Sequence, residues 1–388
     1  MQLVAYGAQD IYLTGNPQVT FFKVMYRRHT NFALESIEQT FSGSVDFGRK
    51  VTATISRNGD LVHKCYLQVE LPALASGSTA AWVRNIGHVL IKEVEIEIGG
   101  QRIDRHYGQW MHIWQELTLT KEHEEGFNVM IGNTTALTTP AASIAATTLY
   151  IPLQFWFNRH VGLALPLIAL QYHEVKINIE FRPFSECFTG SVSSTPTLGG
   201  ASIWVDYVYL DTDERRQFAQ VAHEYLIEEL QFTGSEGFSQ SSIRQRLNFN
   251  HPCKELVWVS QLDSNAAANR WTDFTDGSIA YNGEDPMVDA KLQLNGHDRF
   301  DTRKAAYFNL VQPYQHHTRI PATGIYVYSF ALKPEEHQPS GSVNMSRIDN
   351  ATLQLTMASS AAMKLYTYAT STNVLRVMSG MAGKAYSN

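Results

Sequence analysis

Apolar and polar residues alternate with a period of two along much of this chain. In residues 93–98, Val94, Ile96 and Ile98 alternate with three glutamates, so the apolar side chains should share one face of a strand. Residues 50–56 and 175–181 alternate in the same way. Further strands are predicted at residues 65–71, 151–157, 203–210, 225–232, 255–259, 291–294, 325–332 and 351–357. Many short strands separated by turn residues predict an all-β sandwich or barrel.

Helical patterns are few. The clearest is residues 107–119, with apolar residues at i, i+3, i+4 and i+7. These residues are Trp110, Ile113, Trp114 and Leu117. Residues 303–311 form a weaker counterpart, and Asp211 or Thr212 could cap a short helix that interrupts the strand rhythm.

One segment of the chain occurs twice. Residues 94–104 and 290–301 both contain a strand pattern, a glycine-containing turn, an arginine, a large apolar residue and an aspartate. One inserted residue, which we place in the second turn, separates the two copies. Because the copies lie about half a chain apart, the repeat predicts a duplicated β domain.

The length of 388 residues suits two domains of roughly 150–200 residues each. We predict an N-terminal arm at residues 1–20, a first domain at 21–210, a linker at 211–222 and a second domain at 223–388. Two consecutive eight-stranded jelly-roll sandwiches with a few short helices would use this length well.

Composition narrows the class of protein. The net charge of −6 argues against a general nucleic-acid binder, which would show a basic stripe. Three scattered cysteines form no disulfide framework, and they fit folding in a reducing compartment. The N-terminus shows no signal-peptide pattern, and the longest apolar stretch, residues 162–170, is far shorter than the ~20 residues of a membrane span. We therefore expect a chain made in the cytoplasm.

No catalytic motif stands out. Residues 380–384 resemble the end of a phosphate loop, but Ala385 occupies the position of the required Ser or Thr. His316 and His317 would point to opposite faces of a strand, so solvated histidines are favoured over metal ligands there and in residues 122–125. The alternating glutamates of residues 93–97 fit the water-facing side of a strand. We predict no enzyme, no catalytic residue, no metal site and no cofactor.

Residues 325–330 are apolar on both strand faces, with Tyr326, Tyr328 and Phe330 on one and Ile325 and Val327 on the other. Such a strand is buried twice, either within the fold or against another subunit. The pattern alone leaves both alternatives open.

Three Asn-x-Ser/Thr sequons occur, at Asn133, Asn344 and Asn350. Without a signal peptide, secretory glycosylation should not reach them, so chance occurrence is the default. They are nevertheless the candidate glycosylation sites of this chain.

Several long blocks carry a resemblance to a known family. They are residues 7–23, 26–32, 55–61, 97–104, 166–175, 223–228, 294–300, 346–352 and 374–380. Across nearly the whole chain, the sequence resembles the major capsid proteins of large icosahedral nucleocytoplasmic DNA viruses, with the chlorovirus type of the phycodnaviruses nearest.

The resemblance implies a double jelly roll that forms a homotrimer, a pseudo-hexagonal capsomer that tiles an icosahedral shell. It implies contacts with neighbouring capsomers and minor capsid proteins, an internal lipid membrane beneath the shell, and no direct binding of nucleic acid. Localisation would be the virion, after synthesis and assembly in the host cytoplasm. Relatives are often glycosylated by virus-encoded enzymes at sites that need not be sequons.

Within this family, we expect the polar, turn-rich arm from Gln2 to Asn16 to contact a neighbour or lie beneath the shell. Residues 261–287 look shorter than in longer relatives, so surface decoration on that loop is not carried over. Alternatives are a minor capsid or penton-associated paralogue, a jelly-roll carbohydrate-binding protein, or a cupin-like enzyme.

Overall fold

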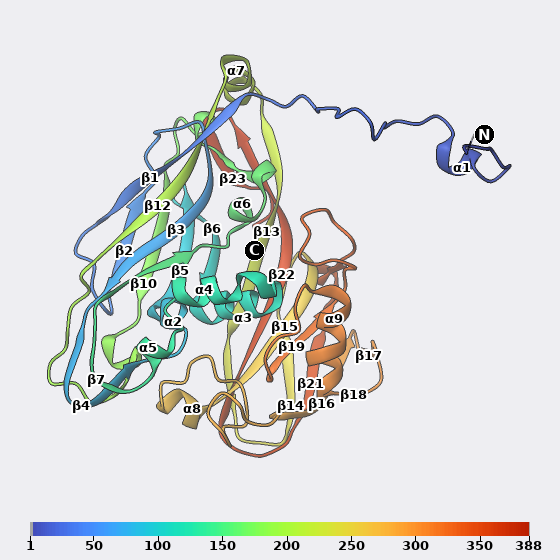
Figure 1. The fold of residues 1–388 in the computed structure, drawn as a ribbon. Coiled ribbons are helices and arrows are strands. Elements are labelled where there is room, and N and C mark those ends of the chain that lie inside the picture. Colours follow the sequence, from blue (N-terminus) through green and yellow to red (C-terminus); the bar gives the residue numbers. More distant parts are fainter. Residues whose placement is uncertain (1–2, 388) are drawn as a thin grey trace.

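The computed structural model describes residues 3–387, apart from the side chains of residues 76–78. It contains two β units, joined by helix α7 (Thr212–Gln220), and an extended segment that leaves the first unit (Figure 1). As predicted, Asp211 caps α7, because its carboxylate accepts a hydrogen bond from the Glu214 amide at 3.1 Å.

The first unit follows α1 (Ile11–Thr14) along the chain. Its elements are β1 (Phe32–Ser42), β2 (Lys50–Thr54), β3 (Leu61–Leu71), β4 (Leu74–Trp82), α2 (Ile86–Leu90), β5 (Ile91–Ile98), β6 (Gln101–Tyr107), α3 (Gly108–Thr118), η1 (Lys121–His123), α4 (Glu124–Met130), α5 (Thr135–Thr138), β7 (Ala141–Ile144), β8 (Thr147–Pro152), α6 (Trp156–Arg159), η2 (Val161–Leu163), β9 (Leu165–Pro166), η3 (Leu167–Ala169), β10 (Val175–Phe181), η4 (Phe184–Glu186), β11 (Phe188–Gly190) and β12 (Gly200–Leu210).

The second unit follows α7. Its elements are β13 (His223–Phe238), β14 (Ser242–Leu247), β15 (Pro252–Leu262), α8 (Asp263–Ala267), β16 (Met287–Leu294), β17 (His297–Asp298), β18 (Arg303–Lys304), η5 (Tyr307–Val311, a π-helix), α9 (Gln312–His316), β19 (Ile325–Ser329), β20 (Val343–Asn344), η6 (Met345–Arg347), β21 (Ala351–Met357), β22 (Met363–Met378) and β23 (Met381–Lys384).

The two units have the same strand order. In the first, β1-β12-β3-β8 forms one layer and β2-β10-β5-β6 the other, and β1 joins the layers because its last two residues pair with β2. In the second, the layers are β13-β22-β15-β19 and β14-β21-β16-β17. The strands correspond one to one in these orders: β1, β12, β3 and β8 match β13, β22, β15 and β19, and β2, β10, β5 and β6 match β14, β21, β16 and β17. The sequence repeat therefore reflects duplication of a whole sandwich.

Each sandwich has its own apolar core. Alternating residues of β3 and β5 fill the first core, where Leu67 and Ile96 are fully buried. Trp258 of β15 and Leu292 of β16 lie in the second core. The predicted alternation therefore gives the right buried face for these strands.

The repeated segment forms a hairpin in both units. Gly99 and Gly100 have φ angles of 59° and 83°, and Asn295 and Gly296 have 53° and 78°. Two successive positive φ angles define the tight turn that suits twisted hairpins and favours Gly and Asn. Both turns are two residues long, so the placement of the inserted residue in the second turn was wrong; the extra residue lies beyond it, in residues 297–299.

Two strand predictions were wrong in part. Residues 151–157 leave β8 at Pro152 and enter α6 at Trp156, and both neighbours of Trp156 are buried as well. Because this run is apolar on every side, alternation could not identify its secondary structure. The predicted strand 325–332 ends at Ser329.

The predicted helix 107–119 is confirmed as α3. Its counterpart at residues 303–311 is shifted, because Arg303 and Lys304 pair with β16 and the helical segment continues through α9 to His316.

The two units are packed against each other through α3. Its four predicted apolar residues contact the outer face of β15, β19 and β22 in the second unit. Trp110 lies 5.2 Å from the ring of Tyr368, measured between centroids. Ile325 and Val327 of β19 also contact this cluster, while Tyr326 lies in the second core. Burial within the fold thus explains this doubly apolar strand.

Candidate functional site

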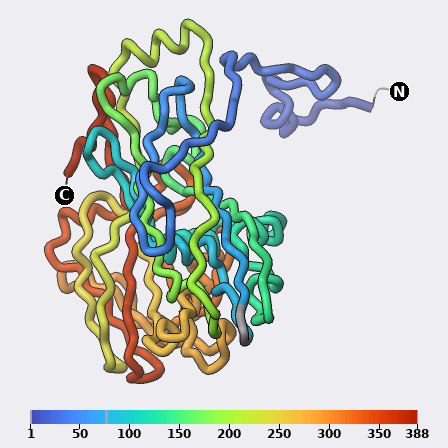
Figure 2. Tube along the Cα trace, turned by 90° about the vertical axis from the view of Figure 1, so that its left-hand side faces the viewer, coloured from blue at the N-terminus to red at the C-terminus, as the bar shows by residue number. Residues whose placement is uncertain are grey.

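The N-terminal segment extends away from the body of the molecule (Figures 1 and 2). The first strand begins only at Phe32, whereas the first domain was predicted from residue 21. Large apolar side chains along the segment are exposed in this chain: Leu3, Val4, Tyr6, Ile11, Tyr12, Leu13, Val19, Phe21, Phe22, Val24, Met25 and Tyr26. Gln2, where the predicted contact arm begins, lies outside the described residues. So many uncovered apolar groups make this segment a candidate contact surface.

A second uncovered apolar surface lies on the helical segment after the second repeat copy. Leu310, Val311 and Tyr314 are 47%, 40% and 78% exposed. Sequence reasoning missed these residues, although their spacing after Asp301 matches that of the α3 residues after Asp104. Comparing the repeat copies beyond the hairpin would have identified them.

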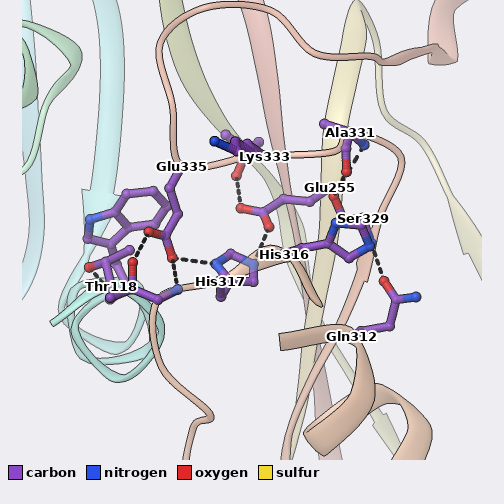
Figure 3. A network of polar contacts seen from close by, with 12 residues as sticks. Thr118, Glu255, Gln312, His316, His317, Ser329, Ala331, Lys333 and Glu335 are labelled. Atoms are coloured by element: carbon purple, nitrogen blue, oxygen red, sulfur yellow. Dashed lines mark hydrogen bonds and ion pairs between the residues drawn. The ribbon is translucent and has the colours of Figure 1, made fainter. Parts of the chain in front are cut away.

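His317, a rejected metal ligand, lies in a buried charge network (Figure 3). Its Nε2 lies 2.8 Å from Oε2 of Glu255, and its Nδ1 lies 2.8 Å from Oε1 of Glu335. Ionised carboxylates only accept hydrogen bonds, so both ring nitrogens donate and the imidazole is charged. Burial alone would lower the pKa of His317, but the two carboxylates outweigh it and raise the pKa to about 9.

This network fixes the position of the helical segment. Glu255 belongs to β15, Glu335 to the loop after β19, and His317 directly follows α9. Gln312 of α9 also accepts a hydrogen bond from the Ser329 amide at 3.1 Å. Nδ1 of the neighbouring His316 lies 2.9 Å from the Leu332 carbonyl oxygen. No cluster of metal-ligating side chains is found among residues 3–387.

The β5 glutamates, predicted to face water, lie on the strand face opposite the apolar core, where Glu93 and Glu97 are half-buried. Glu95 is buried and binds Lys50 of β2 at 3.1 Å as well as Arg105 of β6. Burial alone would raise the pKa of Glu95, but these cations hold it below its ordinary value. Glu93 contacts the same two cations at 3.5 Å. The prediction was wrong for Glu95, because the neighbouring strands supply cations that the pattern of β5 alone cannot show.

The candidate phosphate loop is the turn between β22 and β23. Gly380 has a φ angle of 79°, and a Cβ there would lie 2.5 Å from the ring of Tyr172. The Tyr172 amide donates to the Gly380 carbonyl at 3.0 Å, which links the two units. The Lys384 amide donates to Oε1 of Gln101 of β6 at 3.2 Å across the same seam. Close packing therefore explains this glycine.

Two buried histidines lie where α2 meets α3. Burial, and then the neighbouring His112, lower the pKa of His88 to about 3. Burial also lowers the pKa of His112. The Nδ1 atoms of both rings are buried without a hydrogen-bond partner. Both imidazoles are therefore neutral in the folded chain at pH 7.

Acid should destabilise the chain through His88. Its pKa is lowered on folding, so this stability is complete above about pH 6.5 and is lost as pH falls toward 3. In this window, His88 should lower the free energy of unfolding of the wild type by about 1.4 kcal/mol for each pH unit of acidification. His88→Leu should lack this contribution. Urea unfolding at pH 6 and pH 4 measures the difference. His29→Leu, in the exposed segment, is the control; equal slopes for wild type and His88→Leu would contradict the prediction.

The three sequons lie in different surroundings. Asn344 and Asn350 are exposed. Asn133 is partly buried, and its Nδ2 donates to Oδ1 of Asn128 at 3.2 Å.

Two family sequence models together match most of the chain. One described as "Major capsid protein N-terminus" matches residues 20–211. One described as "Large eukaryotic DNA virus major capsid protein" matches residues 214–383. The boundary between the two matches falls in α7 and the residues before it.

Curated relatives and solved structures agree with these matches. The chain is 55% identical to the major capsid protein of Pyramimonas orientalis virus and 48% identical to that of Phaeocystis pouchetii virus, covering 100% of this chain and 99% of each relative. The crystal structure of PBCV-1 VP54 superposes with a TM-score of 0.83 at 40% identity, covering 95% of this chain and 100% of VP54. The Faustovirus major capsid protein has the same fold, with a TM-score of 0.82 at 12% identity over 96% and 94% of the two chains.

Two duplicated sandwiches, packed through α3 and carrying uncovered apolar surfaces, define a double jelly-roll capsid protein. The chain belongs to the major capsid proteins of large eukaryotic DNA viruses. It is a structural protein of the virion, located in the capsid shell beside neighbouring capsomers. No helix within residues 3–387 is long and apolar enough to cross a membrane.

Proposed function

We propose that three copies of this chain form a homotrimeric capsomer with a pseudo-hexagonal outline. The observation that carries the proposal is the duplication itself, because three chains of two like sandwiches present six similar units around a three-fold axis. A near-hexagonal block tiles a surface without gaps. The trimer acts as a building block and performs no catalysis.

The surroundings of the trimer follow from its place in the shell. We propose that it contacts minor capsid proteins, overlies an internal lipid membrane and binds no nucleic acid directly. Synthesis and assembly take place in the host cytoplasm. If the chain is glycosylated at sequons, Asn344 and Asn350 are the accessible ones. Peptide mapping by mass spectrometry of chains from virions tests this, and a glycan on Asn133 with none on Asn344 or Asn350 would overturn it.

A mass measurement in solution tests the trimer. We expect purified chain at micromolar concentration to have three times the monomer mass of 43.7 kDa by light scattering. A monomer across this concentration range would contradict the proposal. Copy number in purified particles separates a major capsid protein from a minor or penton-associated one, since the major protein must dominate a stained gel.

The exposed N-terminal segment should join capsomers to their surroundings. We expect deletion of residues 2–16 to reduce the yield of closed shells, because its apolar side chains would no longer bury surface against a partner. Electron microscopy of particles from cells expressing the deleted chain measures the yield. A scrambled segment of equal composition is the control, and undiminished shell formation by the deleted chain would contradict the role.

A further inference from the structure

We propose that the η5–α9 segment of one copy packs against the outer face of the β1-β12-β3-β8 layer of the next copy. This inference deepens the proposed trimer, because it names the two surfaces that join its subunits. It rests on the correspondence between the two units and on a contact that the chain already makes once within itself.

The contact within the chain serves as the template. The first unit's helix, α3, covers the outer face of the β13-β22-β15-β19 layer. Trp110, Ile113, Trp114 and Leu117 make this contact, and these residues follow Asp104 of the repeat by 6, 9, 10 and 13 positions. The outer face of the β13-β22-β15-β19 layer is thereby covered by a helix of the same chain.

The second unit has the equivalent helix, and most of the matching face of this helix is exposed. Positions 6, 9, 10 and 13 after Asp301, the repeat's second aspartate, are Tyr307, Leu310, Val311 and Tyr314. All four are apolar or aromatic, and the last three are exposed. In Figure 1, α9 lies on the side of the molecule away from the first unit, so the strand layers of the first unit do not cover this helix.

The equivalent layer of the first unit is covered only at one end, where Ala164 and Phe218 pack on Leu61 and Val208. The β1-β12-β3-β8 layer corresponds to β13-β22-β15-β19, and its outer face carries aromatic side chains. Tyr66 of β3 lies 6.2 Å from Tyr150 of β8 and stacks on Trp204 of β12 at 6.4 Å, between ring centroids. None of the three is fully buried, and Tyr150 is 41% exposed.

A groove lies on this aromatic face. Its volume is about 750 Å³, and Tyr66, Tyr150, Pro152, Trp114 and Met130 contribute to its lining. Charged side chains also line the groove: Lys64, Arg159, Asp206 and Glu335. Most of its exposed lining is nevertheless apolar, so it suits an inserted row of apolar side chains such as Leu310, Val311 and Tyr314.

The pairing of unlike surfaces gives a closed ring. Each copy would use its helix to contact one neighbour and its layer to contact the other, which is a head-to-tail arrangement. Such an arrangement forms a closed ring of three when successive copies are rotated by one third of a turn. In such a trimer, contacts within chains and between chains alternate around the ring. Six sandwiches are then joined by six similar helix-on-layer contacts.

Charges placed on either surface should abolish the trimer. We expect Leu310→Asp/Tyr314→Asp and Tyr66→Asp/Tyr150→Asp each to leave a folded monomer, measured by light scattering at micromolar concentration and by circular dichroism. The control is Met378→Asp/Met381→Asp, because these methionines are similarly exposed on another part of the second unit. The control should remain a trimer.

Mixing the two monomeric variants gives the sharper test. One has an intact layer and the other an intact helix, so a single productive contact forms and a 1:1 dimer that cannot close should appear. A disulfide between Tyr314→Cys of one tagged chain and Tyr150→Cys of another locates the contact, since the three native cysteines are buried.

The outcomes separate this inference from the proposed function. Three results would overturn the helix-on-layer contact but not the trimer. They are charge variants that remain trimeric like the wild type, the absence of a dimer on mixing, and disulfides that join two copies of position 314. A monomeric wild type would overturn the trimer itself.

Discussion

Replacing His317 by glutamine is expected to lower the free energy of unfolding by about 3–5 kcal/mol, one of the two largest effects of single substitutions that we predict. The side chains of His317 and Glu255 are fully buried, and that of Glu335 is 20% exposed. Removing the cation leaves two carboxylates facing each other in a site with little water. Urea or thermal unfolding measures the loss.

The matched control is the adjacent residue. His316→Gln removes only a contact with a backbone carbonyl, so it should change stability little. A triple variant that also carries Glu255→Gln and Glu335→Gln should regain much of the loss, because no charge remains buried. An equal effect of the two histidine substitutions, or no recovery in the triple variant, would contradict the assigned role.

The network also predicts a pH window. The pKa of His317 is raised to about 9, so its contribution is complete below about pH 6.5 and is lost as pH rises through 9. Despite burial, hydrogen bonds from His317 and Thr318 lower the pKa of Glu335, so its contribution is lost as pH falls below the ordinary glutamate range. The difference in the free energy of unfolding between wild type and His317→Gln should therefore become smaller at both high and low pH. Because this network holds α9, the same variant should also weaken the trimer.

Sequence patterns predict the strands that are apolar on one face only. Val94, Ile96 and Ile98 alternate with polar residues, and all three are buried in β5. The 16-residue strand β22 of the second unit was missed, because its centre carries small and polar residues. Thr370, Ser371 and Asn373 are buried there, and their neighbours in space supply hydrogen bonds that the linear pattern does not contain.

The candidate sites followed the same division. The exposed N-terminal segment could be predicted, because its apolar and polar residues do not alternate as they do in a packed strand. The role of His317 could not, because Glu255 and Glu335 lie 62 and 18 positions away in the sequence. The uncovered face of α9 was within reach of sequence reasoning, since the repeat fixes which of its residues correspond to the buried face of α3.

Replacing Trp110 by alanine is expected to cost about 3–5 kcal/mol, as for other large aromatic residues in cores, and to loosen the two units from each other. Trp110 is 1% exposed, and its neighbours Val257, Val327 and Tyr368 all belong to the second unit. The cavity would open at the seam between the sandwiches while both cores stay filled. Protease cleavage in α7, which has no buried residue, should become faster.

Trp258→Ala is the matched control, because Trp258 is also 1% exposed but lies in the core of the second unit. We expect a similar loss of stability, with cleavage concentrated in the second unit instead of in α7. Cleavage by a protease at low concentration, followed by mass spectrometry of the fragments, distinguishes the two patterns. Identical fragment patterns would mean that α3 does not couple the units. The distinction also bears on assembly, because the proposed trimer repeats this helix-on-layer contact between chains. A seam that tolerates Trp110→Ala within the chain would tolerate the loss of Tyr307, its counterpart, between chains.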